Sequence, residues 1–185
     1  MKDTEKYKFV PKLKGVESDS VYLGILDNSD EAILKYVTWM SDEEIGKWTF
    51  ENFRIFTFED AKNWVNKIDD RAYNFSIWID GNMVGTCGLN VDLRRINAYL
   101  DICIGEKDFR NKGLGRIVIC TLTNFAFKEI GVHRCAITYN ADNIQAERCY
   151  KSCGYVECGR EHEATFYNGK YTDVVYLERI NKDEV

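Results

Sequence analysis

The sequence predicts a single α/β domain built on a mixed sheet, and three observations support this. Its 185 residues are 45% hydrophobic and 14% aromatic, which is enough to bury one core. The hydrophobic pattern changes along the chain from helical spacing to strict alternation and back. The expected elements follow the order strand, helix, helix, three strands, helix, strand, helix, two strands. That order is typical of a sheet that is mostly antiparallel and locally parallel around one strand–helix–strand unit.

The first third of the chain supplies one strand and two helices. Residues 1–19 are expected to form a polar N-terminal extension, and a single domain is expected over 20–181. The short strand "VYLGIL" covers 21–26, and the helix over 29–40 follows it with a serine at the N-cap position. A second helix over 57–68 opens with "TFED", an acidic variant of the capping box.

The middle of the chain alternates between apolar and polar residues. Strands are predicted over 73–79 and 83–91, joined by a "DGN" turn into a hairpin. The next strand, over 96–105, carries Tyr99, Asp101 and Cys103 on one face and apolar residues on the other.

The last third of the chain returns to helical spacing and then closes with a hairpin. A helix over 115–130 should end at a glycine, and a strand over 134–139 follows it. A helix over 143–153 leads into a long hairpin whose strands cover 155–167 and 170–180, with an "NG" turn between them.

Composition excludes several classes of function. A net charge of −5 lacks the basic excess that non-specific nucleic-acid binding requires. The seven cysteines and two histidines form no CxxC pair and no zinc-ligand spacing, so no metal site is expected. No signal peptide and no apolar run long enough to cross a bilayer is found, so we expect no membrane partner and a cytoplasmic location.

The stretch "FRNKGLGR", residues 109–116, predicts an anion site. It leads from a strand into a helix, whose first backbone N–H groups lack partners and carry partial positive charge. Gly113 and Gly115 allow a phosphate to approach, and three cations flank them. The stretch matches neither a Walker A loop nor GxGxxG. Taken alone, the stretch slightly favours a plain strand–helix turn over an anion site.

Two motifs together resemble one family. "RNKGLG" matches the [R/Q]-x-x-G-x-[G/A] loop of the GCN5-related N-acetyltransferases (GNAT), and "NIQAERCYKSCGY" resembles their following helix. The closing hairpin and the first two helices resemble the RimJ/RimL branch, so the similarity covers about residues 20–180. It implies a GNAT fold with a mixed, mostly antiparallel seven-stranded sheet and about four helices. It also implies that the strands 96–105 and 134–139 splay apart.

The resemblance implies a coenzyme A site. The pyrophosphate would bind the loop formed by Arg110, Asn111, Lys112, Gly113, Leu114, Gly115 and Arg116. The pantetheine arm would pair with the strand end formed by Ile102, Cys103 and Ile104, and Asn143 matches a position that contacts this arm.

The resemblance also implies direct transfer of an acetyl group from acetyl-CoA to a primary amine. Tyr150 matches the usual general acid. Relatives often carry a glutamate base where this chain has Tyr99, and Asp101 is the nearest substitute. Three acidic residues of the helical region that typically borders the acceptor site are further candidates, although a solvent-exposed role fits each of them better: Glu31, Glu43 and Glu44.

Several alternatives stay open at the level of sequence. The acceptor is a protein N-terminus, a polyamine or an amino sugar, and the chain acts alone or as a homodimer. Two rival classes are a non-catalytic acyl-CoA-binding sensor and an unrelated nucleotide-binding domain.

Overall fold

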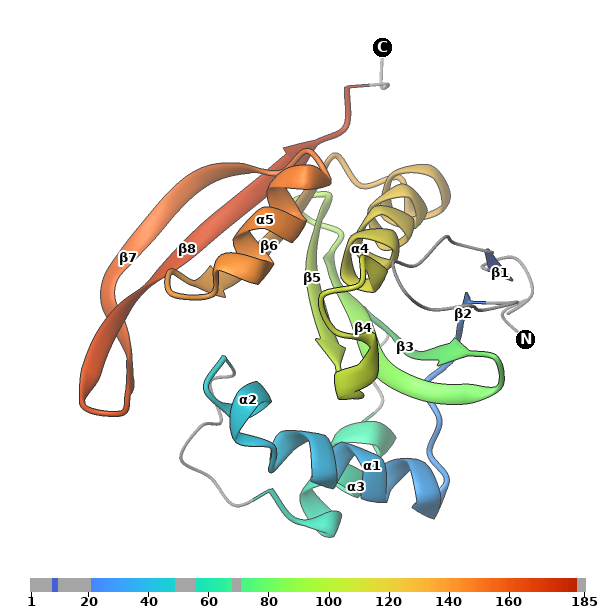
Figure 1. Ribbon diagram of the computed structural model, residues 1–185. Coiled ribbons are helices and arrows are strands. Elements are labelled where there is room, and N and C mark those ends of the chain that lie inside the picture. The colour runs from blue at the N-terminus through green and yellow to red at the C-terminus, as the bar shows by residue number, and fades with distance from the viewer. Residues whose placement is uncertain (1–7, 10–20, 49–55, 68–70, 183–185) are drawn as a thin grey trace.

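The computed structural model describes residues 8–9, 21–48, 56–67 and 71–182. They form a mixed eight-stranded sheet in the order β1-β2-β3-β4-β5-β6-β8-β7 (Figure 1). The strands are β1 (Lys8–Phe9), β2 (Val21–Ile25), β3 (Ala72–Ile79), β4 (Asn82–Asp92), β5 (Asn97–Ile104), β6 (Arg134–Asn140), β7 (Val156–Tyr167) and β8 (Lys170–Ile180). All strand pairs are antiparallel except β5 with β6. The predicted α/β class and mixed sheet are confirmed, and β1 adds an eighth strand from within the predicted N-terminal extension.

Five α-helices occur in the described part of the chain. They are α1 (Asp30–Met40), α2 (Glu43–Gly46), α3 (Phe58–Asn66), α4 (Leu114–Phe125) and α5 (Ile144–Ser152). Four of them were expected, and α2 is the additional one. It has only four residues, and its N-cap Asp42 accepts a hydrogen bond from the amide of Glu44. Such a short helix has no periodicity by which a sequence could reveal it.

Two hydrophobic cores hold these elements together. The larger one lies between the sheet and the helices α4 and α5, which cover the same face of the sheet in Figure 1. The smaller one lies under α1 and α3, which pack together at the lower end of the sheet in that view. The end of β5 therefore lies between the two helical layers.

The predicted helix boundaries are mostly confirmed by their caps. Ser29 accepts a hydrogen bond from the amide of Ala32, and Thr57 forms a reciprocal capping box with Asp60. The predicted helix 115–130 is less regular than expected, because α4 ends at Phe125 and a π-helical turn, η3 (Ala126–Ile130), continues it. Gly131 ends this turn with a φ of +77°.

The splay between β5 and β6 is confirmed. The two strands pair in parallel only at their beginnings, where Asn97, Ala98 and Tyr99 lie opposite Arg134, Cys135 and Ala136. Beyond these pairs they diverge, so the second half of β5 faces a gap. This gap opens towards the end of the sheet where α4 begins (Figure 1). None of the described helices is long and apolar enough to span a membrane.

Candidate active site

The loop between β5 and α4 forms a cradle of unpaired backbone amides. Asn111 and Gly113 both adopt positive φ angles, of +61° and +95°, which turn the chain into the helix. No described residue accepts a hydrogen bond from the amides of residues 111–116, and Gly113 provides no side-chain cap. These N–H groups lie at the positive end of the α4 dipole. Lys112 and Arg116 flank them without an ion pair to any described residue, so the loop is suited to an anion.

The two glycines of this loop have different roles. A Cβ on Gly113 would meet no protein atom within 4 Å, so it would project into open space. A Cβ on Gly115 would lie 3.4 Å from the Sγ of Cys149 in α5. Gly115 therefore allows α5 to approach the start of α4 closely, whereas Gly113 keeps the anion cradle open.

Arg110 does not point into the cradle. Its guanidinium donates to the carbonyls of Ile104 and Gly105 and to the carboxylates of Asp42 and Glu44. Its backbone amide donates to the carbonyl of Lys107 at 3.1 Å. Of the seven predicted loop residues, Arg110 is thus the one whose donors are already occupied by protein.

The gap beside β5 exposes the main chain of alternate residues. The amide of Gly105 donates to the carbonyl of Val84 at 2.9 Å, so Gly105 and Cys103 direct their main-chain groups towards β4. Ile102 and Ile104 consequently direct theirs towards β6, which no longer pairs there. Of the three predicted pantetheine contacts, these two have main-chain groups in the gap, and Cys103 does not.

Tyr150 projects from α5 into the larger core beside this gap. It is 8% exposed, and its ring packs edge-to-face on Tyr139 at a centroid distance of 6.2 Å. Burial raises the pKa of Tyr150, and the neighbouring groups Cys149 and Asp101 add to this effect. Its hydroxyl has no hydrogen-bond partner among the described residues. A protonated hydroxyl without a protein partner is available to act as a general acid.

Asn143 serves as the N-cap of α5. Its Oδ1 accepts a hydrogen bond from the amide of Ala146 at 3.0 Å, which fixes the start of the helix that carries Tyr150. The predicted contact with the cofactor arm would have to use the remaining amide group of this side chain.

Asp101 lies on β5, on the face opposite to Ile102 and Ile104. Its carboxylate sits over Gly88 of β4, where a Cβ would be 2.9 Å from its Oδ2. Asp101 is exposed at the surface of the sheet, but the neighbouring strands partly desolvate its carboxyl group, which raises its pKa to about 6. A carboxyl with this pKa is ionised at neutral pH and can accept a proton there.

The remaining acidic candidates differ in position. Glu31 is exposed in the first turn of α1, at the end of the helix far from α2. Glu44 is ion-paired to Arg110 at 3.0 Å. Glu43 accepts a hydrogen bond from the hydroxyl of Tyr167 at 3.1 Å, near the tip of the β7–β8 hairpin. The structure therefore brings Glu43 and Glu44 to one corner and leaves Glu31 outside it.

Comparison with known proteins identifies this arrangement. The family model for the acetyltransferase (GNAT) domain matches residues 22–156. The chain belongs to the GNAT acetyltransferase family. The protein is thus an acetyl-CoA-dependent N-acetyltransferase, related to the RimJ/RimL-like members of the family.

Individual relatives of this GNAT acetyltransferase have been named for different acceptors. The spermidine N(1)-acetyltransferase of Vibrio cholerae is 28% identical over 122 residues, 64% of this chain and 70% of the relative. The L-amino acid N-acetyltransferase AaaT of Escherichia coli is 25% identical over 122 residues, 63% of this chain and 75% of the relative. The structure of RimL, a ribosomal L7/L12 alpha-N-protein acetyltransferase, in complex with coenzyme A shares the fold. Its TM-score is 0.76 at 17% identity, and the match covers 91% of this chain and 98% of that one.

Sequence reasoning missed the residues of this GNAT domain that join α2 to the rest of the site. They are Asp42, which binds Arg110, Tyr167, which binds Glu43, and Asn140. The side-chain amide of Asn140 donates to the carbonyl of Lys47 at 3.5 Å. Each pair is separated by at least 66 residues in the chain, so no local pattern could reveal it. The only available signal was the acidic run "SDEE" just after α1.

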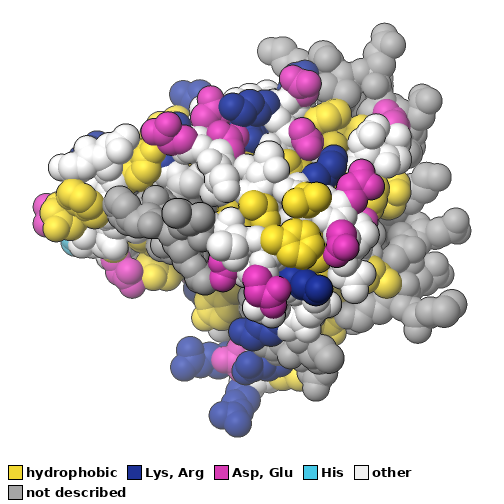
Figure 2. Space-filling view, turned by 90° about the horizontal axis from the view of Figure 1, so that it is seen from below, with side chains coloured by type: hydrophobic (Ala, Val, Ile, Leu, Met, Phe, Trp, Pro, Cys, Tyr) yellow, Lys and Arg dark blue, Asp and Glu magenta, His cyan; other side chains and the backbone are white. Residues whose placement is uncertain are grey.

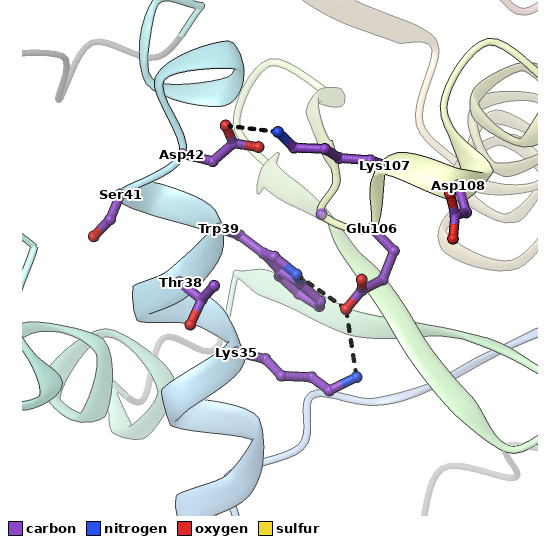
Figure 3. A pocket seen from close by; sticks show the side chains of 9 residues that line it. Lys35, Thr38, Trp39, Ser41, Asp42, Glu106, Lys107 and Asp108 are labelled. Carbon is purple, nitrogen blue, oxygen red and sulfur yellow. Dashed lines mark hydrogen bonds and ion pairs between the residues drawn. The ribbon is translucent and has the colours of Figure 1, made fainter.

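A pocket of about 570 Å³ lies where α1 meets the loop after β5. Figure 3 shows Glu106 at its centre, accepting hydrogen bonds from the indole of Trp39 at 3.3 Å and from Lys35 at 3.5 Å. Lys107 reaches Asp42 across the same pocket at 3.7 Å. Most charges here are thus paired within the protein, and the pocket marks the joint between α1 and the end of β5.

Proposed function

We propose that the chain transfers the acetyl group of acetyl-CoA to a primary amine by direct attack within a ternary complex. One observation supports this proposal: the loop with unpaired amides before α4, the unpaired main-chain groups of Ile102 and Ile104, and Tyr150 all border the β5–β6 gap, while Asp101 lies on the opposite face of β5. No covalent enzyme intermediate is required, because the amine itself attacks the thioester.

The proposed steps divide among the residues around the gap. Acetyl-CoA supplies the activated acetyl group. The backbone N–H groups of Ile102 and Ile104, directed into the gap, can hold the arm of the cofactor and the developing oxyanion. Asp101 accepts the proton released by the amine, directly or through water, and Tyr150 donates a proton to the departing thiolate. The amides of residues 111–116 hold the pyrophosphate.

We propose a small amine or a protein N-terminus as the acceptor. The relatives named above for spermidine, for an L-amino acid and for ribosomal L7/L12 support this range. The acidic corner of α2 gives limited support to a polycation, because Arg110 and Lys107 pair with both Asp42 and Glu44. Seen from below, acidic and basic side chains are interspersed over this face (Figure 2).

A panel of amines tests the proposed function. The protein is mixed with acetyl-CoA and, in turn, spermidine, L-amino acids, an amino-sugar nucleotide and short peptides, and free coenzyme A thiol is measured. We expect release with at least one acceptor class. Tight binding of acetyl-CoA without turnover on any amine would instead support a non-catalytic sensor.

The raised pKa of Asp101 predicts a specific pH dependence of the rate. Because the carboxylate is the form that accepts a proton, kcat/KM should rise as the pH increases through about 6. In Asp101→Asn this limb should disappear, and kcat/KM at neutral pH should fall by about 100-fold. Asp108→Asn, which removes an exposed carboxylate nearby, serves as the control and should retain the limb. An unchanged profile in Asp101→Asn would remove Asp101 from the mechanism.

The same pKa shift predicts the pH dependence of stability. A carboxyl whose pKa is raised on folding favours the folded state when protonated, and this contribution is lost as the pH rises from about 4 to about 6. Relative to the wild type, Asp101→Asn should therefore gain stability above pH 6 and not below pH 4. Thermal unfolding of both proteins across this range measures the effect.

A further inference from the structure

One side chain, Arg110, connects the loop after β5 to the α2 corner, which we define as residues 42–47. Its side chain is only 18% exposed, and its ion pairs with Asp42 and Glu44 are both 3.0 Å long. Its Nε donates to the carbonyl of Ile104 at 3.0 Å, and the guanidinium also reaches the carbonyl of Gly105. Four of the five guanidinium N–H groups are thereby used within the protein.

The partners of Arg110 belong to two different parts of the site. Ile104 is the last residue of β5, which lines the gap, and Gly105 follows it directly. Asp42 caps α2, and Glu44 lies within it. A single planar guanidinium thus joins the strand that faces the cofactor gap to the helix on the other side of the joint.

The α2 corner is also hydrogen-bonded to β6 and β7, on the side of the gap opposite to β5. The carbonyl of Lys47, just after α2, accepts from Asn140 at the end of β6, and Glu43 accepts from Tyr167 of β7. Because β5 and β6 have separated by this point, α2 spans the open end of the gap between them. Arg110 is the anchor on the β5 side of this span.

The neighbouring contacts support the same joint but cannot replace Arg110. Lys107 also approaches Asp42 and Glu44, at 3.7 and 3.6 Å, yet its side chain is 64% exposed. Trp39 packs directly on Gly105, where a Cβ would clash with the indole ring. This contact fixes α1 rather than α2. Figure 3 shows Trp39 and Asp42 on one side of the pocket and Lys107 on the other.

We propose that Arg110 is a positioning residue for the acceptor and not a ligand of the pyrophosphate. It holds α2 across the end of the gap, and we infer that α2 in this position forms the side of the acceptor site that orients the amine. This inference rests on the proposed function, because it assigns α2 to the acceptor side of that site. Loss of Arg110 should therefore weaken the use of the acceptor, whereas loss of Lys112 should weaken binding of the cofactor.

The test compares Arg110→Ala with Lys112→Ala in two assays. We expect Arg110→Ala to raise the KM of the acceptor and lower kcat/KM by about 10- to 100-fold, as misplacement of a reactant does. Its affinity for coenzyme A, measured by calorimetry, should stay within about threefold of the wild type. Lys112→Ala should show the reverse pattern, because only a phosphate contact is removed. Arg110→Lys keeps the positive charge but loses the planar guanidinium that bonds several acceptors at once. Its activity should therefore lie between those of Arg110→Ala and the wild type.

A measurement that needs no turnover separates this inference from the proposed function. Hydrogen exchange of the amides in residues 43–48 should be faster in Arg110→Ala and unchanged in Lys112→Ala. If Arg110→Ala weakened binding of coenzyme A by tenfold or more and left this exchange unchanged, the inference would be overturned, with or without an active acceptor. If no amine were turned over, the exchange result alone would decide the role of Arg110 as the anchor of α2.

Discussion

Replacing Tyr150 with Phe is expected to lower kcat by about 100-fold or more, with little change in affinity for acetyl-CoA. The hydroxyl of Tyr150 is the proposed donor of a proton to the coenzyme A thiolate, and phenylalanine keeps the ring but not the donor. Burial raises the pKa of Tyr150, so the hydroxyl stays protonated across the working pH range. Steady-state kinetics with calorimetric binding of acetyl-CoA measure the two quantities separately.

The same substitution should leave stability almost unchanged. The hydroxyl of Tyr150 has no hydrogen-bond partner among the described residues, so its removal leaves no described group unsatisfied. We expect a change in the free energy of unfolding within about 0.5 kcal/mol. A loss of activity would then not be attributable to unfolding.

Tyr155→Phe is the matched control. The hydroxyl of Thr123 donates to the carbonyl of Ile119 at 2.7 Å, so Tyr155 must donate the 2.7 Å hydrogen bond between Tyr155 and Thr123. Removing it should cost about 1 kcal/mol of stability and should not alter kcat. We therefore expect Tyr150→Phe to lower kcat without changing stability, and Tyr155→Phe to lower stability without changing kcat. Equal kcat values for Tyr150→Phe and wild type would exclude Tyr150 as the general acid.

Replacing Gly113 with Ala is expected to weaken binding of coenzyme A by about 10- to 100-fold. The added Cβ would project into open space at the loop where we propose that the pyrophosphate binds. This range corresponds to losing one hydrogen bond to a charged group, about 1.5–3 kcal/mol. Calorimetric titration with coenzyme A measures the effect.

Gly131→Ala separates this effect from backbone strain. Gly131 lies beyond the opposite end of the same helical segment, also has a positive φ, and has equally open space at its Cβ position. Both substitutions should cost roughly 1–2 kcal/mol of stability, because an L side chain is strained in this conformation. Only Gly113→Ala should affect coenzyme A. If both variants bound coenzyme A as wild type does, the loop would not be the pyrophosphate site.

Much of the fold could be predicted because its signals are local. The alternation of β5 and the capping box at Thr57 each depend on residues a few positions apart. The anion cradle is similarly local, since a loop and the first turn of one helix supply its amides. For the same reason the predicted order of elements was correct apart from β1 and α2.

The sequence could not show that neighbouring residues of one motif have different structural roles, because their roles depend on different contact partners. Gly113 and Gly115 belong to one motif, yet one leaves the cradle open and the other admits Cys149 of α5. Ile102 and Cys103 are neighbours, yet only Ile102 directs its main chain into the gap. Which edge of β5 is free depends on where β6 departs, and that is a property of the sheet.

By itself, the sequence determined the fold class and the position of the glycine loop at the start of α4, because short-range geometry specifies helix starts, strand faces and glycine turns. Only the tertiary structure decided what Arg110 does. Its partners Asp42 and Glu44 lie 68 and 66 residues away in the chain, and folding brings them within 3.0 Å of the guanidinium. A charged side chain binds whichever opposite charges the fold places nearest to it, and a motif of eight residues does not contain that information.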